Sequence, residues 1–118
     1  MTRLSFPAFR TLADRLADEL PPDLTRNLNG GILAVPKRVK RGGYWILGEY
    51  VEDLMGRTVY LYHGSFRELF AGEPREVWEE EIRETLMHEL THHLEALAGV
   101  DDLGQAEEEE FGPPAGAT

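Results

Sequence analysis

The feature that most restricts the fold of this chain of 118 residues is one long helical pattern between Pro74 and Ala98. Pro74 suits the first turn of a helix, and the acidic residues around and after it favour the positive end of the helix dipole. Gly99 follows the pattern directly and is the residue type that most often ends a helix. An unbroken helix here would have about 25 residues and be roughly 37 Å long.

Shorter patterns precede this helix. Apolar residues at helical spacing predict a first helix from Phe9 to Leu20, which Pro21 and Pro22 end. Short apolar or alternating segments predict three strands, Leu28 to Val35, Tyr44 to Val51 and Thr58 to His63. A short turn of helix is expected from Ser65 to Phe70.

The length of the chain suits one hydrophobic core and is too short for two. From Gly104 onward the composition cannot build a core, because it consists mainly of Glu, Gly, Pro and Ala. We therefore predict a single domain over residues 1–104 and an acidic, partly disordered tail over residues 105–118.

Cysteine is absent, which excludes disulfides, thiolate catalysis and Cys-based zinc fingers. Any metal would have to be held by His, Asp or Glu. No apolar run resembles a signal sequence or could span a bilayer, so we expect no membrane partner and a cytoplasmic location.

Charge is distributed unevenly along the chain, whose formal net charge is −10. Acidic residues dominate positions 73–110, whereas the loop from Lys37 to Arg41 is basic. Because an acidic protein repels phosphate backbones, we expect no nucleic-acid partner unless this loop acts alone.

Three of the four histidines lie in the segment 88–93, HELTHH, which contains the zinc-binding pattern HExxH. On a helix, His88 and His92 are one turn apart, so their imidazoles can converge on one zinc ion. Glu89 borders this point and can act as general base toward an attacking water molecule. The pattern therefore predicts peptide hydrolysis, although two solvated histidines on a surface helix would give the same spacing.

The predicted helix has two sides. Apolar residues suited to the core are Val77, Leu86, Leu90, Leu94 and Leu97. The residues assigned to the polar side, which would line a cleft, are Thr85, His88, Glu89, His92 and Glu95. His93 is rotated by about 100° from His92, so we interpret it as a packing or hydrogen-bonding residue. His63 is interpreted as structural, with lining the cleft as the alternative.

With HELTHH and the later Gly99-Val100-Asp101-Asp102, the chain resembles the small bacterial zincin-like metallopeptidases, a minimal family related to metzincins by the pattern HExxHxxGxxD. The resemblance implies an α+β fold, in which a small mixed three- or four-stranded sheet packs against an N-terminal helix and the long HExxH helix. It also implies a bound Zn²⁺ and a peptide or protein substrate.

The third metal ligand is harder to assign, because about four residues are inserted before Gly99 relative to the family pattern. Asp102 is the preferred third ligand and Asp101 the next, since a helix that ends in Gly reverses the chain. Glu95 could reach the metal from within the helix, and the cluster Glu107 to Glu110 could reach it from a returning segment.

Three functions follow from these patterns. The leading hypothesis is a zinc-dependent peptidase that binds an extended peptide along a sheet edge. The alternative is a non-catalytic zinc-binding interaction module, in which the metal is structural. Metal-dependent RNA processing would require the loop from Lys37 to Arg41 to bind phosphate.

Overall fold

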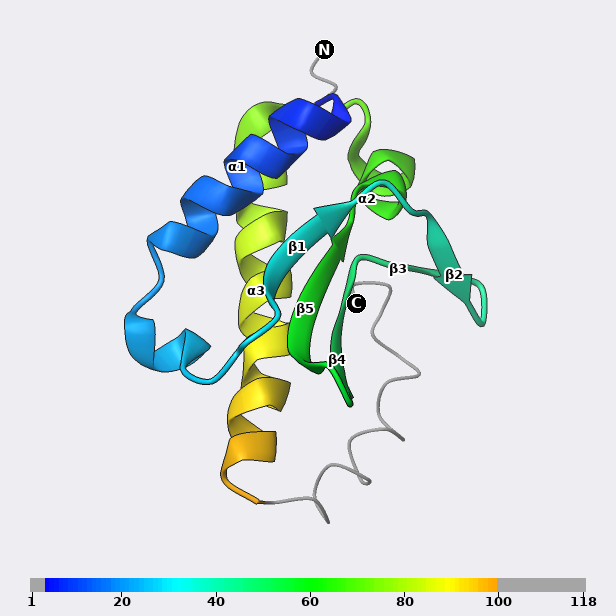
Figure 1. Ribbon diagram of the computed structural model, residues 1–118. Coiled ribbons are helices and arrows are strands. Elements are labelled where there is room, and N and C mark those ends of the chain that lie inside the picture. Colours follow the sequence, from blue (N-terminus) through cyan, green and yellow to red (C-terminus); the bar gives the residue numbers. More distant parts are fainter. Residues whose placement is uncertain (1–3, 100–118) are drawn as a thin grey trace.

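The structure is a computed structural model that describes residues 4–99, which form a mixed helix and strand architecture (Figure 1). The elements in chain order are α1 Phe6–Asp18, the 3-10 helix η1 Pro22–Thr25, β1 Gly31–Val35, β2 Val39–Arg41, β3 Tyr44–Ile46, β4 Gly48–Asp53, β5 Gly56–Tyr62, α2 His63–Phe70 and α3 Arg75–Leu97. This confirms the α+β fold expected from the sequence.

The main sheet has three strands in the order β1-β5-β4. β1 pairs with β5 in parallel, and β4 pairs with β5 antiparallel, so the sheet is mixed as expected. β2 and β3 form a separate antiparallel ribbon that extends to one side of the sheet (Figure 1). In the part of the chain that the structure describes, no strand pairs with the second edge of β4.

The core lies between the main sheet and the helices α1 and α3, which cover the same face of the sheet (Figure 1). α1 begins where the Ser5 side chain accepts a hydrogen bond from the backbone N–H of Ala8, and it buries one apolar stripe. The core residues of the two helices are Phe9, Leu12, Ala13, Leu16, Trp78, Ile82, Leu86 and Leu90.

α3 ends as the sequence predicts. The backbone N–H of Gly99 donates to the carbonyl of Ala96, and Gly99 has a φ of 76°, a left-handed conformation that favours glycine. The helix is therefore continuous through the whole segment 88–93, and both candidate ligand histidines lie on regular helix.

Several predicted boundaries were wrong. α1 starts at Phe6 rather than Phe9, because Ser5 caps it. The strand expected from Tyr44 to Val51 is broken at the buried Leu47, where the chain leaves the ribbon and enters the main sheet as β4. His63 is the first residue of α2, and the last residue of β5 is Tyr62.

The basic segment expected to be a loop contains the strand β2. The ribbon is attached to the start of α2, where the Ser65 side chain accepts from the N–H of Val39 and donates to its carbonyl. The basic side chains of the ribbon are engaged: Arg38 pairs with Glu68, and Lys40 lies over the ring of Trp45.

Two predictions concern the organisation of the whole chain. The domain boundary at residue 104 and the tail over residues 105–118 lie outside the described residues. Within residues 4–99, no helix has the length and apolar character needed to cross a membrane.

Candidate metal and catalytic site

His88 and His92 lie on consecutive turns of α3 and face each other. Their Nε2 atoms are 3.3 Å apart, and their ring centroids are 4.9 Å apart. Burial, followed by the charge of neighbouring His92, lowers the pKa of His88 below its ordinary value. Both effects favour the neutral imidazole, which is the form that binds metals.

The separation of these two nitrogens fits a zinc ion. In a tetrahedral site with Zn–N bonds of about 2.0–2.1 Å, two ligand nitrogens lie roughly 3.3–3.4 Å apart. Within residues 4–99, however, no group of three or more His, Asp or Glu residues could hold a metal together. The described residues therefore supply two candidate ligands of a metal site, the imidazoles of His88 and His92.

Glu95 was one of the candidates for the third ligand. Its Oε1 atom lies 3.8 Å from Nδ1 of His92, the ring nitrogen that is not directed at His88. The Glu95 carboxylate therefore lies beside the outer nitrogen of His92, and not between the two Nε2 atoms where a shared metal would be held. The other candidates, Asp101, Asp102 and Glu107 to Glu110, lie outside the described residues.

Glu89 is buried on the inner side of α3, with 5% of its surface exposed. This corrects the assignment of Glu89 and Thr85 to the same cleft-lining side of the helix as His88 and His92, because both are buried. Burial raises the pKa of Glu89 to about 8, with a smaller contribution from the charge of Glu49, and a hydrogen bond from the backbone of Tyr50 acts in the opposite direction.

His93 is fully buried and uses both of its ring nitrogens. Nε2 lies 2.6 Å from the carbonyl oxygen of Arg26, and Nδ1 lies 3.0 Å from the hydroxyl of Tyr50. Because a carbonyl can only accept, Nε2 carries the proton and Nδ1 accepts from the tyrosine. The prediction that His93 packs and hydrogen-bonds rather than binding metal is confirmed.

His63 belongs to the core at the other end of the molecule. Its Nε2 lies 2.8 Å from the carbonyl oxygen of Leu4, and its ring packs against Phe9 and Trp78. Trp78 precedes His88 by ten residues, about 15 Å along the axis of α3. The structural interpretation of His63 is confirmed, and it does not line the site.

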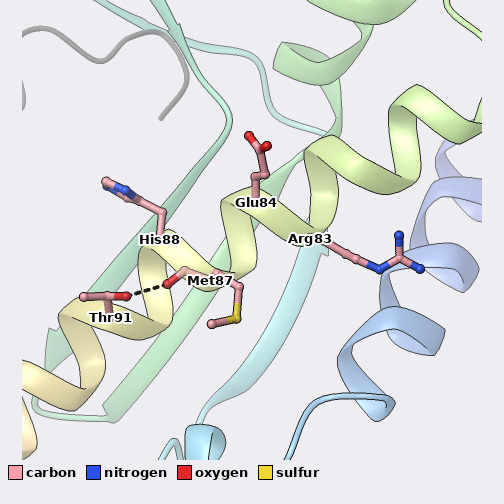
Figure 2. Close-up of a pocket in the computed structure, with 5 residues that line it drawn as sticks. All are labelled: Arg83, Glu84, Met87, His88 and Thr91. Carbon is pink, nitrogen blue, oxygen red and sulfur yellow. Dashed lines mark hydrogen bonds between the residues drawn. The ribbon is translucent and has the colours of Figure 1, made fainter.

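An open pocket of about 420 Å³ lies beside His88 on the outer side of α3 (Figure 2). Its lining residues are Arg83, Glu84, Met87, His88 and Thr91. Figure 2 shows Arg83 directed away from His88, and its guanidinium lies 3.9 Å from the carboxylate of Glu19, which follows α1. The hydroxyl of Thr91 donates to the carbonyl of Met87 at 2.8 Å.

β4 packs on α3, and its second edge pairs with no other strand among the described residues. The backbone N–H of Tyr62 donates to the carbonyl of Leu47, which fixes the odd-numbered residues of β4 as those that bond β5. The peptide groups of Gly48, Tyr50 and Glu52 therefore point away from β5, toward the outer edge. Sequence reasoning missed the contact of Tyr50 with α3. Tyr50 and His93 are 43 residues apart in sequence, and only the tertiary fold brings them together.

Comparison with known proteins identifies the family of this chain. The profile of the zincin-like metallopeptidase family matches residues 46–110, which include β4, all of α3 and the segment 88–93. A conserved hypothetical protein from Thermus thermophilus, of known structure, is 38% identical with a TM-score of 0.70, over 80% of this chain and 98% of that one. A search of curated proteins gave no match. The chain belongs to the zincin-like metallopeptidase family.

Proposed function

We propose that the protein is a zinc-dependent peptidase in which His88 and His92 hold the metal and Glu89 is the general base. The observation that carries this proposal is the distance of 3.3 Å between the two Nε2 atoms, which matches the spacing of two ligands on tetrahedral zinc. When bound, zinc supplies a Lewis acid that polarises a carbonyl and makes water acidic enough to lose a proton near neutral pH.

Glu89 has the properties of a base that works beside a cation. Its burial raises its pKa to about 8, so its carboxylate, once ionised, accepts a proton more readily than an exposed one does. A neighbouring positive charge favours the ionised form of a carboxyl group. Glu89 would take the proton of the attacking water and return it to the leaving amine.

The third ligand that we propose is Asp102, with Asp101 next and Glu107 to Glu110 after them. The family match extends to residue 110 and therefore includes all of these acids. Glu95 ranks below them, because it faces the Nδ1 atom of His92.

The substrate that we propose is an extended peptide or protein segment bound along the outer edge of β4. That edge presents the backbone groups of Gly48 and Glu52 and the carbonyl of Tyr50 next to α3, and such groups bind an added strand by main-chain hydrogen bonds. The pocket beside His88 would accept one substrate side chain against Met87 (Figure 2). The cytoplasm remains the expected location.

The test of this function is the substitution Glu89→Gln in full-length protein loaded with zinc. Peptide hydrolysis should fall by about 10²–10⁴-fold, the usual contribution of a general base, while zinc per chain stays unchanged. Glu80→Gln is the matched control, because Glu80 is an exposed carboxylate of the same helix that does not line the pocket. Hydrolysis retained in Glu89→Gln would exclude the mechanism.

The zinc-binding interaction module remains the second candidate, because the described residues supply only two ligands and a metal would connect α3 to the segment that follows it. In that case, removing zinc would lower the melting temperature strongly, and no peptide would be cleaved by the wild type. Cleavage by the wild type that is lost in Glu89→Gln would reject this candidate.

A further inference from the structure

The inner side of α3 carries three polar residues, Thr85, Glu89 and His93, spaced four residues apart. All three are buried, with exposed fractions of 3%, 5% and 0%. Residues at this spacing form one stripe along a helix. β4 lies along this stripe and contacts it on both sides of Glu89.

The first contact joins Gly48 of β4 to Thr85. A Cβ atom at Gly48 would lie 2.9 Å from Cγ2 of Thr85 and 2.7 Å from the carbonyl oxygen of Tyr60. Real Cβ atoms do not approach other heavy atoms so closely. The absence of a side chain at Gly48 therefore lets the strand approach the helix one turn before Glu89.

The second contact joins Tyr50 of β4 to His93, one turn after Glu89. The tyrosine hydroxyl donates to Nδ1 of His93 at 3.0 Å, and the two rings are 5.3 Å apart. His93 is itself fixed, because its Nε2–H donates to the carbonyl of Arg26. The hydroxyl of Tyr50 is thus attached to a side chain that cannot rotate without losing a second hydrogen bond.

Between the two contacts, the backbone of Tyr50 acts on the buried Glu89 carboxyl and opposes the rise in its pKa. The pairing of β4 with β5 agrees with this, because it directs the Tyr50 peptide group toward the outer edge. One residue therefore holds the helix at two points, with its side chain on His93 and its backbone on Glu89.

We propose that Tyr50 and His93 are positioning residues, which fix the outer edge of β4 beside Glu89. The proposal rests on the proposed function for its catalytic meaning, since the edge is where the substrate would bind and Glu89 is the base. Its consequence is that the hydroxyl of Tyr50, which bonds His93 and neither of the candidate ligands, affects catalysis through the backbone of the same residue.

The test uses Tyr50→Phe in full-length protein and two measurements. The first is the hydrogen-exchange rate of the residue-50 amide, which the wild type should protect although β4 is an edge strand. The second is peptide hydrolysis by zinc-loaded protein. Tyr50→Phe should speed exchange of this amide by about tenfold or more, and should lower kcat by about tenfold with little change in KM, because a displaced catalytic group loses rate steeply.

Tyr62→Phe is the matched control. The Tyr62 hydroxyl donates to Glu49 at 2.5 Å, so the control also removes one tyrosine hydrogen bond to β4, but from the opposite face of the sheet. Tyr62→Phe should leave the exchange rate of the residue-50 amide and the kcat unchanged. Equal effects of the two substitutions would overturn the proposal, because they would show a general loosening of the sheet.

Two substitutions at His93 separate positioning from simple packing. His93→Asn places its amide near the position of Nδ1 and should keep an acceptor for the Tyr50 hydroxyl. His93→Gln places its amide near the position of Nε2 and should keep the donor to the Arg26 carbonyl instead. Slower residue-50 exchange and higher kcat in His93→Asn than in His93→Gln would support the proposal. Equal exchange rates and equal kcat in the two variants would overturn it.

A further variant, Glu89→Ala, removes the carboxyl on which the Tyr50 backbone acts and should also speed exchange at residue 50 by about tenfold or more. If the wild type hydrolyses no peptide, the proposed function fails, and the exchange rates decide the proposal by themselves. Unchanged exchange at residue 50 in Tyr50→Phe, His93→Gln and Glu89→Ala would overturn it.

Discussion

The two sides of α3 carry histidines in opposite situations. On the outer side, the Nε2 atoms of His88 and His92 point at each other, 3.3 Å apart. On the inner side, His93 is buried and directs its nitrogens to the carbonyl of Arg26 and the hydroxyl of Tyr50. The difference shows that a histidine is available to a metal when its nitrogens point to a shared position, and is structural when protein groups already use both of them.

The largest effect that distinguishes the two sides is on stability without metal. His93→Ala should lower the free energy of unfolding of the zinc-free protein by about 2–4 kcal/mol, because it leaves a cavity and a buried carbonyl without its donor. His92→Ala should change it by less than about 1 kcal/mol, because His92 is partly exposed. Urea unfolding of both variants measures the difference.

The effect on bound zinc should be the reverse, larger for His92→Ala than for His93→Ala. His92→Ala should lose bound zinc, and His93→Ala should retain it under conditions in which it is folded. Loss of zinc from both variants to the same extent would contradict the division of α3 into a metal-binding side and a structural side.

A smaller effect is expected from the close contact on the inner side. Gly48→Ala should lower the free energy of unfolding by about 1–3 kcal/mol, because its methyl group would overlap Thr85 and the backbone of Tyr60. Gly72→Ala is the control, since a Cβ there meets no atom within 4 Å and its backbone is not left-handed. Similar stabilities of the two variants would show that β4 can move away from α3 at little cost.

The smallest effect compares two threonines of α3, each of which donates to the carbonyl four residues earlier. Thr85→Ala should cost about 1 kcal/mol, because Thr85 is buried and its methyl group packs on Gly48. Thr91→Ala should lie within about 0.5 kcal/mol of the wild type, because Thr91 is exposed. Thermal or urea unfolding would detect an inverted order, which would contradict the assignment of the two sides.

The sequence predicted α3 and the convergence of His88 with His92 well, because both depend on local spacing. The helix limits are set by Pro74 and Gly99, and the pairing of His88 with His92 follows from one helical turn. These features need no knowledge of what the helix packs against.

The sequence did not predict which side Glu89 faces. The assignment of polar residues to one cleft-lining side fails at Thr85 and Glu89, whose burial depends on partners from β4 that are distant in sequence. The break at Leu47 was missed for a similar reason, because the residues on both sides of it are suited to strands. Such features depend on tertiary contacts, which local patterns do not contain.

The most direct measurement of the central claim is zinc per chain, determined by elemental analysis after dialysis of the full-length protein. The wild type should retain about one zinc ion, and the double variant His88→Ala/His92→Ala should retain none. A wild type that takes up no zinc when zinc is supplied, or a double variant that retains it, would contradict the assignment of these two histidines as the metal-binding pair.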